Sequence, residues 1–240
     1  MTLLRSLLSS ASLLALTHSI IADESKPLWK PVVGDSWTYS VTVEVQEGAT
    51  LPKNVEGQKV EKLEGKVRAT FSQTNVYKGL KPFSEKTPEM HAFYVANGKD
   101  LQEIQYMQIT DTLLTATGIK QEGDKPQPLL PFTKAIPLMD SSWKGGEGFP
   151  FAMINVVDGR KVPMARKFKV LGWETLETKA GEFTAMHVQL TGKNGPIEIK
   201  RSYWFAPQVG FIKEVKKYYA GEKTIFTQVR ILDKVSRAKG

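Results

Sequence analysis

The chain has 240 residues, of which 41% are hydrophobic and 24% charged, and it contains no Cys. This composition supports a globular core and excludes a disordered chain, a collagen-like chain and a disulfide scaffold. Without Cys, thiol catalysis, thiolate zinc sites and redox switching are excluded as well.

Residues 1–22 have the three-part pattern of a secretory signal peptide. Arg5 supplies the positive start, an apolar run follows from Leu7 to Leu16, and Ala22 is a small residue before the expected cleavage point. The apolar run falls short of the roughly 20 residues that a membrane-spanning helix needs, and no later stretch is apolar enough to span a bilayer. We therefore expect export, to the periplasm or as a secreted protein, with no transmembrane segment.

The basic charge has a different meaning in an exported protein. The formal net charge is +8, and loss of residues 1–22 removes one cation and leaves +7. Outside the cytoplasm we expect no nucleic-acid partner, so lipid headgroups or other anionic envelope components become the better candidates. Plain solubility is the simpler interpretation, since the Lys residues are spread along polar strand faces.

The mature chain predicts strands almost throughout. Residues 37–46 alternate apolar and polar side chains, the pattern of a strand with one buried and one wet face. Turn signals such as Asn97-Gly98 separate further strands. The expected strands are 66–72, 90–96, 101–109, 112–120, 166–175, 183–190, 197–205, 211–219 and 223–232. We predict a mainly β protein, a large curved antiparallel sheet or half-barrel meander with at most short helices.

A Pro-rich segment, residues 123–137, separates the two halves of this pattern. Pro cannot donate a hydrogen bond to a sheet, so this segment is expected to cross between strands. We predict a single antiparallel β domain over residues 23–240. Two lobes, 23–122 and 138–240, joined by the Pro-rich segment, are the alternative.

Three patches resemble a group of exported bacterial β-sheet proteins of unknown function. The patches are a Gly-x-x-Trp-x-Tyr opening at residues 34–39, an Ala-Gly-x-Phe turn at 180–183, and a Trp-Tyr-Ala-Pro-x-Val-Gly-x-(Val/Ile)-Lys pattern at 204–213. The resemblance implies a curved antiparallel sheet, distantly similar to the fold of periplasmic lipoprotein carriers. It supplies no catalytic residues, and a fold does not transfer a function.

The third patch departs from the group's pattern at two positions. Phe205 stands where Tyr is usual, and Gln208 stands where Gly is usual. The second change predicts a turn that needs no positive φ at residue 208. Gly181, Pro207 and Gly210 are expected to form the tight connections between strands.

The aromatic residues of these patches have two interpretations. They either fill the core where the sheet closes or line a ligand pocket at the same place. The candidate ligand-binding residues are Trp37, Tyr39, Phe183, Trp204 and Phe205.

No catalytic or metal site stands out, and we expect no cofactor. Only His91 and His187 lie beyond the signal peptide, too few for a His-rich metal site. His187 is expected on the wetter strand face, as a surface or hydrogen-bonded residue. Glu174 and Glu177 could act as an acid and base only if folding placed them across one cleft, and strand alternation puts them on opposite faces.

Three functions remain open. The first is a non-enzymatic envelope protein that binds an apolar or amphipathic ligand in the concave face of the sheet. The second is a structural or interaction scaffold with a filled core that docks an envelope protein. The third is a carboxylate-based hydrolase, which requires a carboxylate pair in a cleft with a raised pKa.

Overall fold

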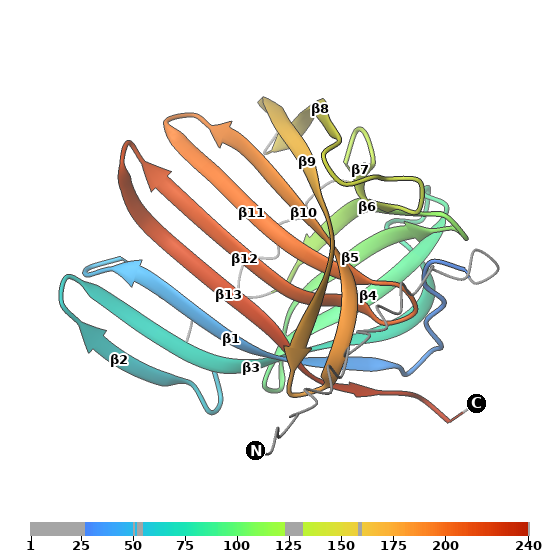
Figure 1. Ribbon diagram of the computed structural model, residues 1–240, viewed down its shortest axis with the longest axis horizontal. Coiled ribbons are helices and arrows are strands. Elements are labelled where there is room, and N and C mark those ends of the chain that lie inside the picture. The colour runs from blue at the N-terminus through green and yellow to red at the C-terminus, as the bar shows by residue number, and fades with distance from the viewer. Residues whose placement is uncertain (1–26, 50, 52–54, 123–131, 158–159, 240) are drawn as a thin grey trace, which may run out of the picture.

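The computed structural model describes residues 27–49, 51, 55–122, 132–157 and 160–239 (Figure 1). The expected signal peptide lies outside the described residues. The described part consists of strands and contains no helix, and hence none that could cross a membrane. The strands are β1 (Ser36–Gln46), β2 (Lys59–Leu63), β3 (Lys66–Pro82), β4 (Glu89–Asn97), β5 (Asp100–Ile109), β6 (Leu113–Gln121), β7 (Ile136–Asp140), β8 (Gly148–Val157), β9 (Arg160–Thr178), β10 (Gly181–Asn194), β11 (Ile197–Ala206), β12 (Gly210–Ala220) and β13 (Lys223–Ser236).

All described strands belong to one antiparallel sheet. The order is β7-β6-β5-β4-β3-β1-β13-β12-β11-β10-β9-β8, with β2 paired to the first part of β3. Two meanders, β3 to β7 and β8 to β13, are thus joined by β1, which pairs with β3 on one side and β13 on the other.

The sheet is nearly closed into a barrel. Its two ends, β7 and β8, approach each other at the top of Figure 1. The hydroxyl of Thr133 donates a hydrogen bond to the carbonyl of Ile154 on β8, at 2.6 Å. The prediction of a mainly β, curved antiparallel sheet is confirmed.

The connection between the meanders differs in detail from the prediction. Residues 123–131 of the Pro-rich segment lie outside the described residues, but residues 136–140 form β7, in which Pro137 lies opposite Thr115. Pro is tolerated there because β7 ends the sheet order and one of its sides has no ladder to complete. The chain crosses from β7 to β8 through residues 141–147.

Apolar alternation determines which face of each strand is buried. On β1, Trp37, Tyr39, Val41, Val43 and Val45 are all buried, whereas the residues between them are partly exposed. The predicted strands are present, and several are longer than expected. β2, β7 and β8 were not predicted.

A cluster of aromatic rings closes one end of the barrel. Trp29, just before β1, stacks on Phe93 of β4 with ring centroids 5.0 Å apart. Trp37 and Phe205 make T-shaped contacts with the same indole, with ring centroids 5.3 and 5.8 Å from that of Trp29. Since these rings come from both meanders, their burial closes the sheet on itself.

The turn between β11 and β12 is shaped by its contact with this closed end. Gly210 has φ +106°, and a Cβ there would lie 2.9 Å from the Trp29 indole, so only Gly fits. Gln208 has φ +64°, so the prediction that this position needs no positive φ is wrong. The backbone N–H of Gln208 donates to the carbonyl of Leu28 at 2.9 Å, and the backbone carbonyl of Gln208 accepts from Arg237 at 2.5 Å. These bonds hold the turn in the left-handed conformation.

Replacing Gln208 with Gly is expected to stabilise the protein by about 1 kcal/mol. A left-handed conformation costs a non-Gly residue roughly 1–2 kcal/mol, and the freedom of Gly in the unfolded chain offsets part of the gain. Urea denaturation measures the difference. Gln208→Ala keeps the Cβ and is expected to give no gain. An equal gain for Ala, or a loss for Gly, would contradict this account.

Candidate functional site

Charged side chains occupy the inner face of β11, β12 and β13 beyond the aromatic end. Arg201 on β11 lies opposite Lys216 on β12, and Glu214 on β12 lies opposite Arg230 on β13. Residues directly opposite each other in antiparallel strands share one face of the sheet. The register therefore gathers these four side chains into one group, called here the charged cluster.

Glu214 is the centre of the charged cluster. One carboxylate oxygen accepts from Arg201 Nε at 2.5 Å and from Lys216 Nζ at 3.2 Å. The other oxygen accepts from Arg230 Nη2 at 2.9 Å. The Glu214 side chain is only 5% exposed, so three cations surround one buried carboxylate.

The carboxyl of Glu214 is ionised at neutral pH. Burial alone would raise the pKa of Glu214, but the charges of Arg201, Lys216 and Arg230 outweigh it and hold this pKa well below its usual range. Burial lowers the pKa of Lys216, with Glu214 opposing that shift. Burial also raises the pKa of the nearby Tyr39 phenol to about 12, so it stays neutral.

A cavity of about 140 Å³ adjoins the charged cluster. This is close to the size of a cavity that holds a benzene molecule. Its walls come from β5 to β7 on one side and β11 to β13 on the other, and consist of Glu103, Gln105, Tyr106, Met107, Ala116, Gly118, Ile119, Leu138, Arg201, Phe211, Glu214, Lys216 and Arg230. With three cations against two carboxylates, the lining carries one net positive charge.

One hydrogen-bond donor of Arg230 has no acceptor in the described structure. Its guanidinium lies 4.5 Å from the centre of the Tyr39 ring, and Nη1 donates to Gln73 at 3.1 Å. Its Nε is buried and has no hydrogen-bond partner in the described structure, and the same is true of the Tyr203 hydroxyl. A buried donor without a partner is costly. An anion in the adjoining cavity would offer Arg230 the acceptor it lacks.

The residues predicted to bind a ligand do not line this cavity. Trp37, Tyr39 and Phe205 are buried at or next to the closed end, and Phe183 is partly buried against the same core. Trp37 and Phe205 meet through Trp29. Tyr39 contacts two residues of the cavity lining, because Arg230 lies over its ring and its hydroxyl donates to the carbonyl of Phe211 at 3.1 Å. Trp204 belongs to the same buried cluster and lies opposite His187 on β10. Ligand binding by these five residues stays a prediction.

Trp204 also forms a group with His187 and Glu174. The Trp204 and His187 rings stack 4.1 Å apart. His187 Nδ1 lies 2.8 Å from a Glu174 oxygen, which also accepts from the Trp204 indole N–H. Burial lowers the pKa of His187 although Glu174 opposes the shift. His187 is thus a hydrogen-bonded residue, and among the described residues no group of three or more His, Asp or Glu could hold a metal ion.

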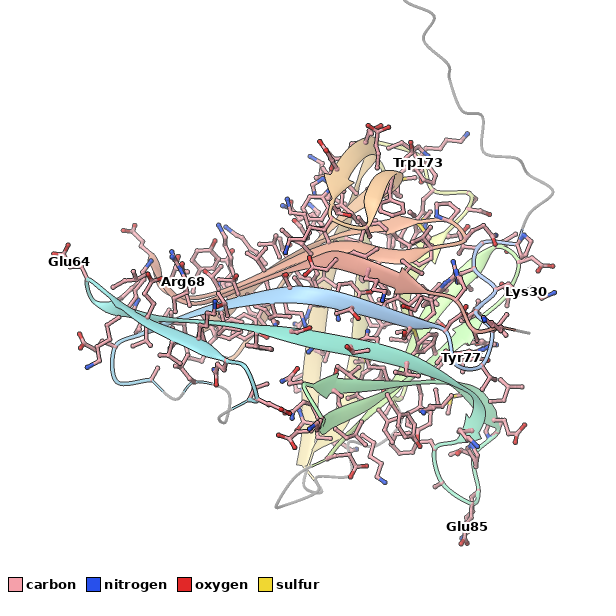
Figure 2. All side chains as sticks on the ribbon, turned by 90° about the horizontal axis from the view of Figure 1, so that it is seen from below. Lys30, Glu64, Arg68, Tyr77, Glu85 and Trp173 are labelled. Carbon is pink, nitrogen blue, oxygen red and sulfur yellow. The ribbon has the colours of Figure 1, made fainter. Side chains whose placement is uncertain are left out.

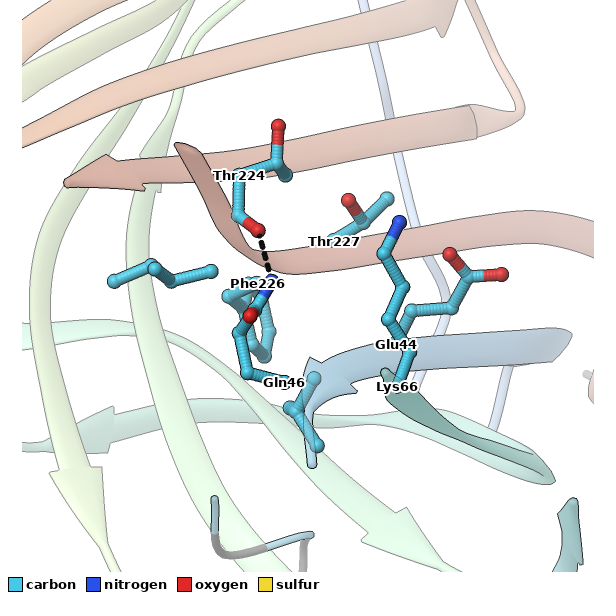
Figure 3. A pocket seen from close by; sticks show the side chains of 8 residues that line it. Glu44, Gln46, Lys66, Thr224, Phe226 and Thr227 are labelled. Carbon is cyan, nitrogen blue, oxygen red and sulfur yellow. Dashed lines mark hydrogen bonds between the residues drawn. The ribbon is translucent and has the colours of Figure 1, made fainter. Parts of the chain in front are cut away.

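A second hollow lies between the ends of β1 and β13 (Figure 3). The Gln46 side-chain amide bridges it by donating to the carbonyl of Thr224 at 2.7 Å. The hollow leaves no room for a water-sized molecule, so it is not a ligand cavity.

The sequence prediction missed all four residues of the charged cluster. The alternation on β13 did not reveal it, because Ile225, Val229 and Ile231 make the face opposite Arg230 at least as apolar as the face that carries it.

Two solved structures resemble the chain at low sequence identity. One, from Bacteroides fragilis, is described as a "putative exported protein with YmcC-like fold". It has a TM-score of 0.51 at 11% identity, over 88% of this chain and 100% of its own. The other, a "putative lipoprotein" from Parabacteroides distasonis, has a TM-score of 0.47 at 9% identity, over 88% and 99%.

The likeness to the Bacteroides fragilis protein shows a distantly shared fold and nothing about function. No protein-family model matches the chain, and neither does any curated protein. The resemblance to specific motifs therefore stays a prediction.

Glu214→Gln is expected to lower the free energy of unfolding at neutral pH by about 3 kcal/mol, because it leaves the buried Arg230 and the partly buried Arg201 and Lys216 without their partner. In the wild type, the contribution of Glu214 is complete above the ordinary carboxyl pKa of 4.5 and is lost as the pH falls below it. The variant should therefore lose less stability than the wild type between about pH 5 and pH 3.

Denaturant titrations across this pH range make the comparison. Glu198→Gln is the matched control, because Glu198 forms a partly exposed ion pair with Lys200 at 3.3 Å. Its effect should stay within about 0.5 kcal/mol. An acid sensitivity of Glu214→Gln equal to that of the wild type would contradict the assignment.

Proposed function

We propose that the protein is an exported, non-enzymatic protein of the cell envelope that binds an anionic envelope component in its interior cavity. The observation that carries the proposal is the surplus of positive charge around that cavity, where Arg201, Lys216 and Arg230 outnumber the two carboxylates, Glu103 and Glu214. Charge-assisted hydrogen bonds from Arg and Lys are the usual means of holding a phosphate or carboxylate group. The signal pattern of residues 1–22 and the shared fold of an exported protein support the compartment.

The proposal narrows the ligand predicted from the sequence. The aromatic rings of Trp29, Trp37, Phe93 and Phe205 fill the closed end of the barrel, so that region has no space for a wholly apolar ligand. The lining of the cavity next to it is mixed, with charged residues beside apolar ones. A ligand with an anionic group could supply the acceptor that Arg230 Nε lacks, whereas a hydrocarbon alone could not.

The chemistry of the site favours binding over hydrolysis. A carboxyl that acts as a general acid needs a raised pKa. The cavity's central carboxyl, Glu214, has a lowered pKa, as does the other buried carboxyl with a resolved shift, Asp35. Asp35 is bound by Arg237 at 2.8 Å and by backbone amides.

A scaffold that docks an envelope protein is the second candidate. The filled aromatic end favours it, because it shows that much of the interior serves packing. In that case the charged cluster would only fix the strand register, and an anion would add nothing to stability.

The test compares glycerol 3-phosphate with glycerol as ligands. Glycerol 3-phosphate should raise the melting temperature and give measurable heat in titration calorimetry, whereas glycerol should do neither. Lys216→Gln should weaken phosphate binding about tenfold or more, since a hydrogen bond to a charged group contributes roughly 1.5–3 kcal/mol.

Lys217→Gln is the matched control. Lys217 is the next residue on β12 and is exposed on the opposite face. The Lys217→Gln substitution removes the same charge as Lys216→Gln. Its binding should stay within about twofold of the wild type. No response to glycerol 3-phosphate, or an equal response in the Lys216 variant, would overturn the proposal.

A further inference from the structure

Beyond the charged cluster, aromatic and apolar side chains follow on the inner face toward the open end of the barrel, with Arg166 of β9 near Tyr218. Tyr218 follows Lys216 by two residues on β12, and it lies opposite Ile199 on β11 and Phe226 on β13. The Tyr218 and Phe226 rings stack with centroids 4.8 Å apart. Ile199, Tyr218 and Phe226 thus form a continuous row across three strands, called here the apolar wall.

Among the described residues, the opposite meander leaves the apolar wall partly open. All three of its side chains are partly exposed. Strands β11 to β13 and β1 extend past β4 to β6 at this end (Figure 1). In the view from below, β1, β3 and β13 run toward Glu64 and Arg68, whereas β4 and β5 stay nearer Tyr77 (Figure 2).

The distances match a ligand with a charged head and a short chain. Successive residues on one face of a strand are about 7 Å apart, so Tyr218 follows Lys216 by that step. Neighbouring strands are about 4.8 Å apart, so the wall from Ile199 to Phe226 spans roughly 10 Å. An anionic group in the cavity would therefore place an attached hydrocarbon chain on the wall.

We infer that the ligand is an amphipathic anion, with its anionic group at Lys216 and Arg230 and its hydrocarbon chain on the wall formed by Ile199, Tyr218 and Phe226. The inference rests on the proposed function and adds the ligand class and the place of its apolar part. The juxtaposition of the buried Arg230 and the partly buried Lys216 with a partly exposed apolar row on one strand face carries it. A small inorganic anion alone would leave the wall in water.

The experiment measures the affinity for alkyl phosphates of increasing chain length, below their micelle concentrations, by titration calorimetry. Each fully buried methylene strengthens binding about fourfold. On a wall that covers one side of the chain, the four methylenes from hexyl to decyl phosphate should strengthen it about tenfold or more. Decyl maltoside, which has the same chain and a neutral head, should bind at least about tenfold more weakly than decyl phosphate.

Tyr218→Ala tests the wall, and Tyr219→Ala is its matched control. Tyr219 is the next residue on β12, is also partly exposed, and faces the other side, where Lys200 lies 4.9 Å from its ring centre. Tyr218→Ala should remove most of the gain from the longer chain and leave glycerol 3-phosphate binding unchanged. Tyr219→Ala should keep the gain.

The outcomes separate the two proposals. If glycerol 3-phosphate binds but chain length adds nothing, or if both Tyr variants keep the gain, the inference fails and the proposed function stands. Equal affinity for decyl phosphate and decyl maltoside also overturns the inference. If neither glycerol 3-phosphate nor any alkyl phosphate binds, the proposed function fails as well.

Discussion

The two meanders of the sheet are held together by one strand, β1, which pairs with β13 and with β3 along its whole length. Its inward side chains are buried without exception, from Trp37 to Val45. Because β1 fixes both neighbours, it sets the register of everything that faces the interior. Along β11 to β13, the interior side chains belong first to the aromatic end, then to the charged cluster and then to the apolar wall.

The interior side chains change from aromatic to charged along the barrel, and the two groups contribute differently to the stability of the fold. The aromatic end stabilises the fold by burying large apolar rings. The charged cluster adds little to the stability of the fold, because the free energy needed to remove its ions from water is about as large as the free energy gained from their attraction. A core of the same volume built from apolar residues would fold at least as well. The surplus of cations around a cavity is therefore an argument for the proposed binding function, since stability does not require it.

The alternating sequence of β1 and of the second meander was enough to predict the sheet. The edge strands β7 and β8 were missed because Pro137 and Pro150 disrupt the expected strand signal. The charged cluster could not be placed because β-bulges change which residues face inward. The irregularity between Trp204 and Phe205 lets both Phe211 and Glu214 line the cavity, although they are three residues apart. Only the folded register shows that Arg201, Lys216 and Arg230 meet.

Native mass spectrometry of the mature protein, purified without detergent from cells that export it, tests the central claim most directly. The account predicts a bound anionic amphiphile that is present in the wild type and in Lys217→Gln and is lost from Lys216→Gln. A neutral apolar ligand, an anion retained equally in both variants, or a wild-type protein that carries no ligand and takes up no added decyl phosphate would contradict it.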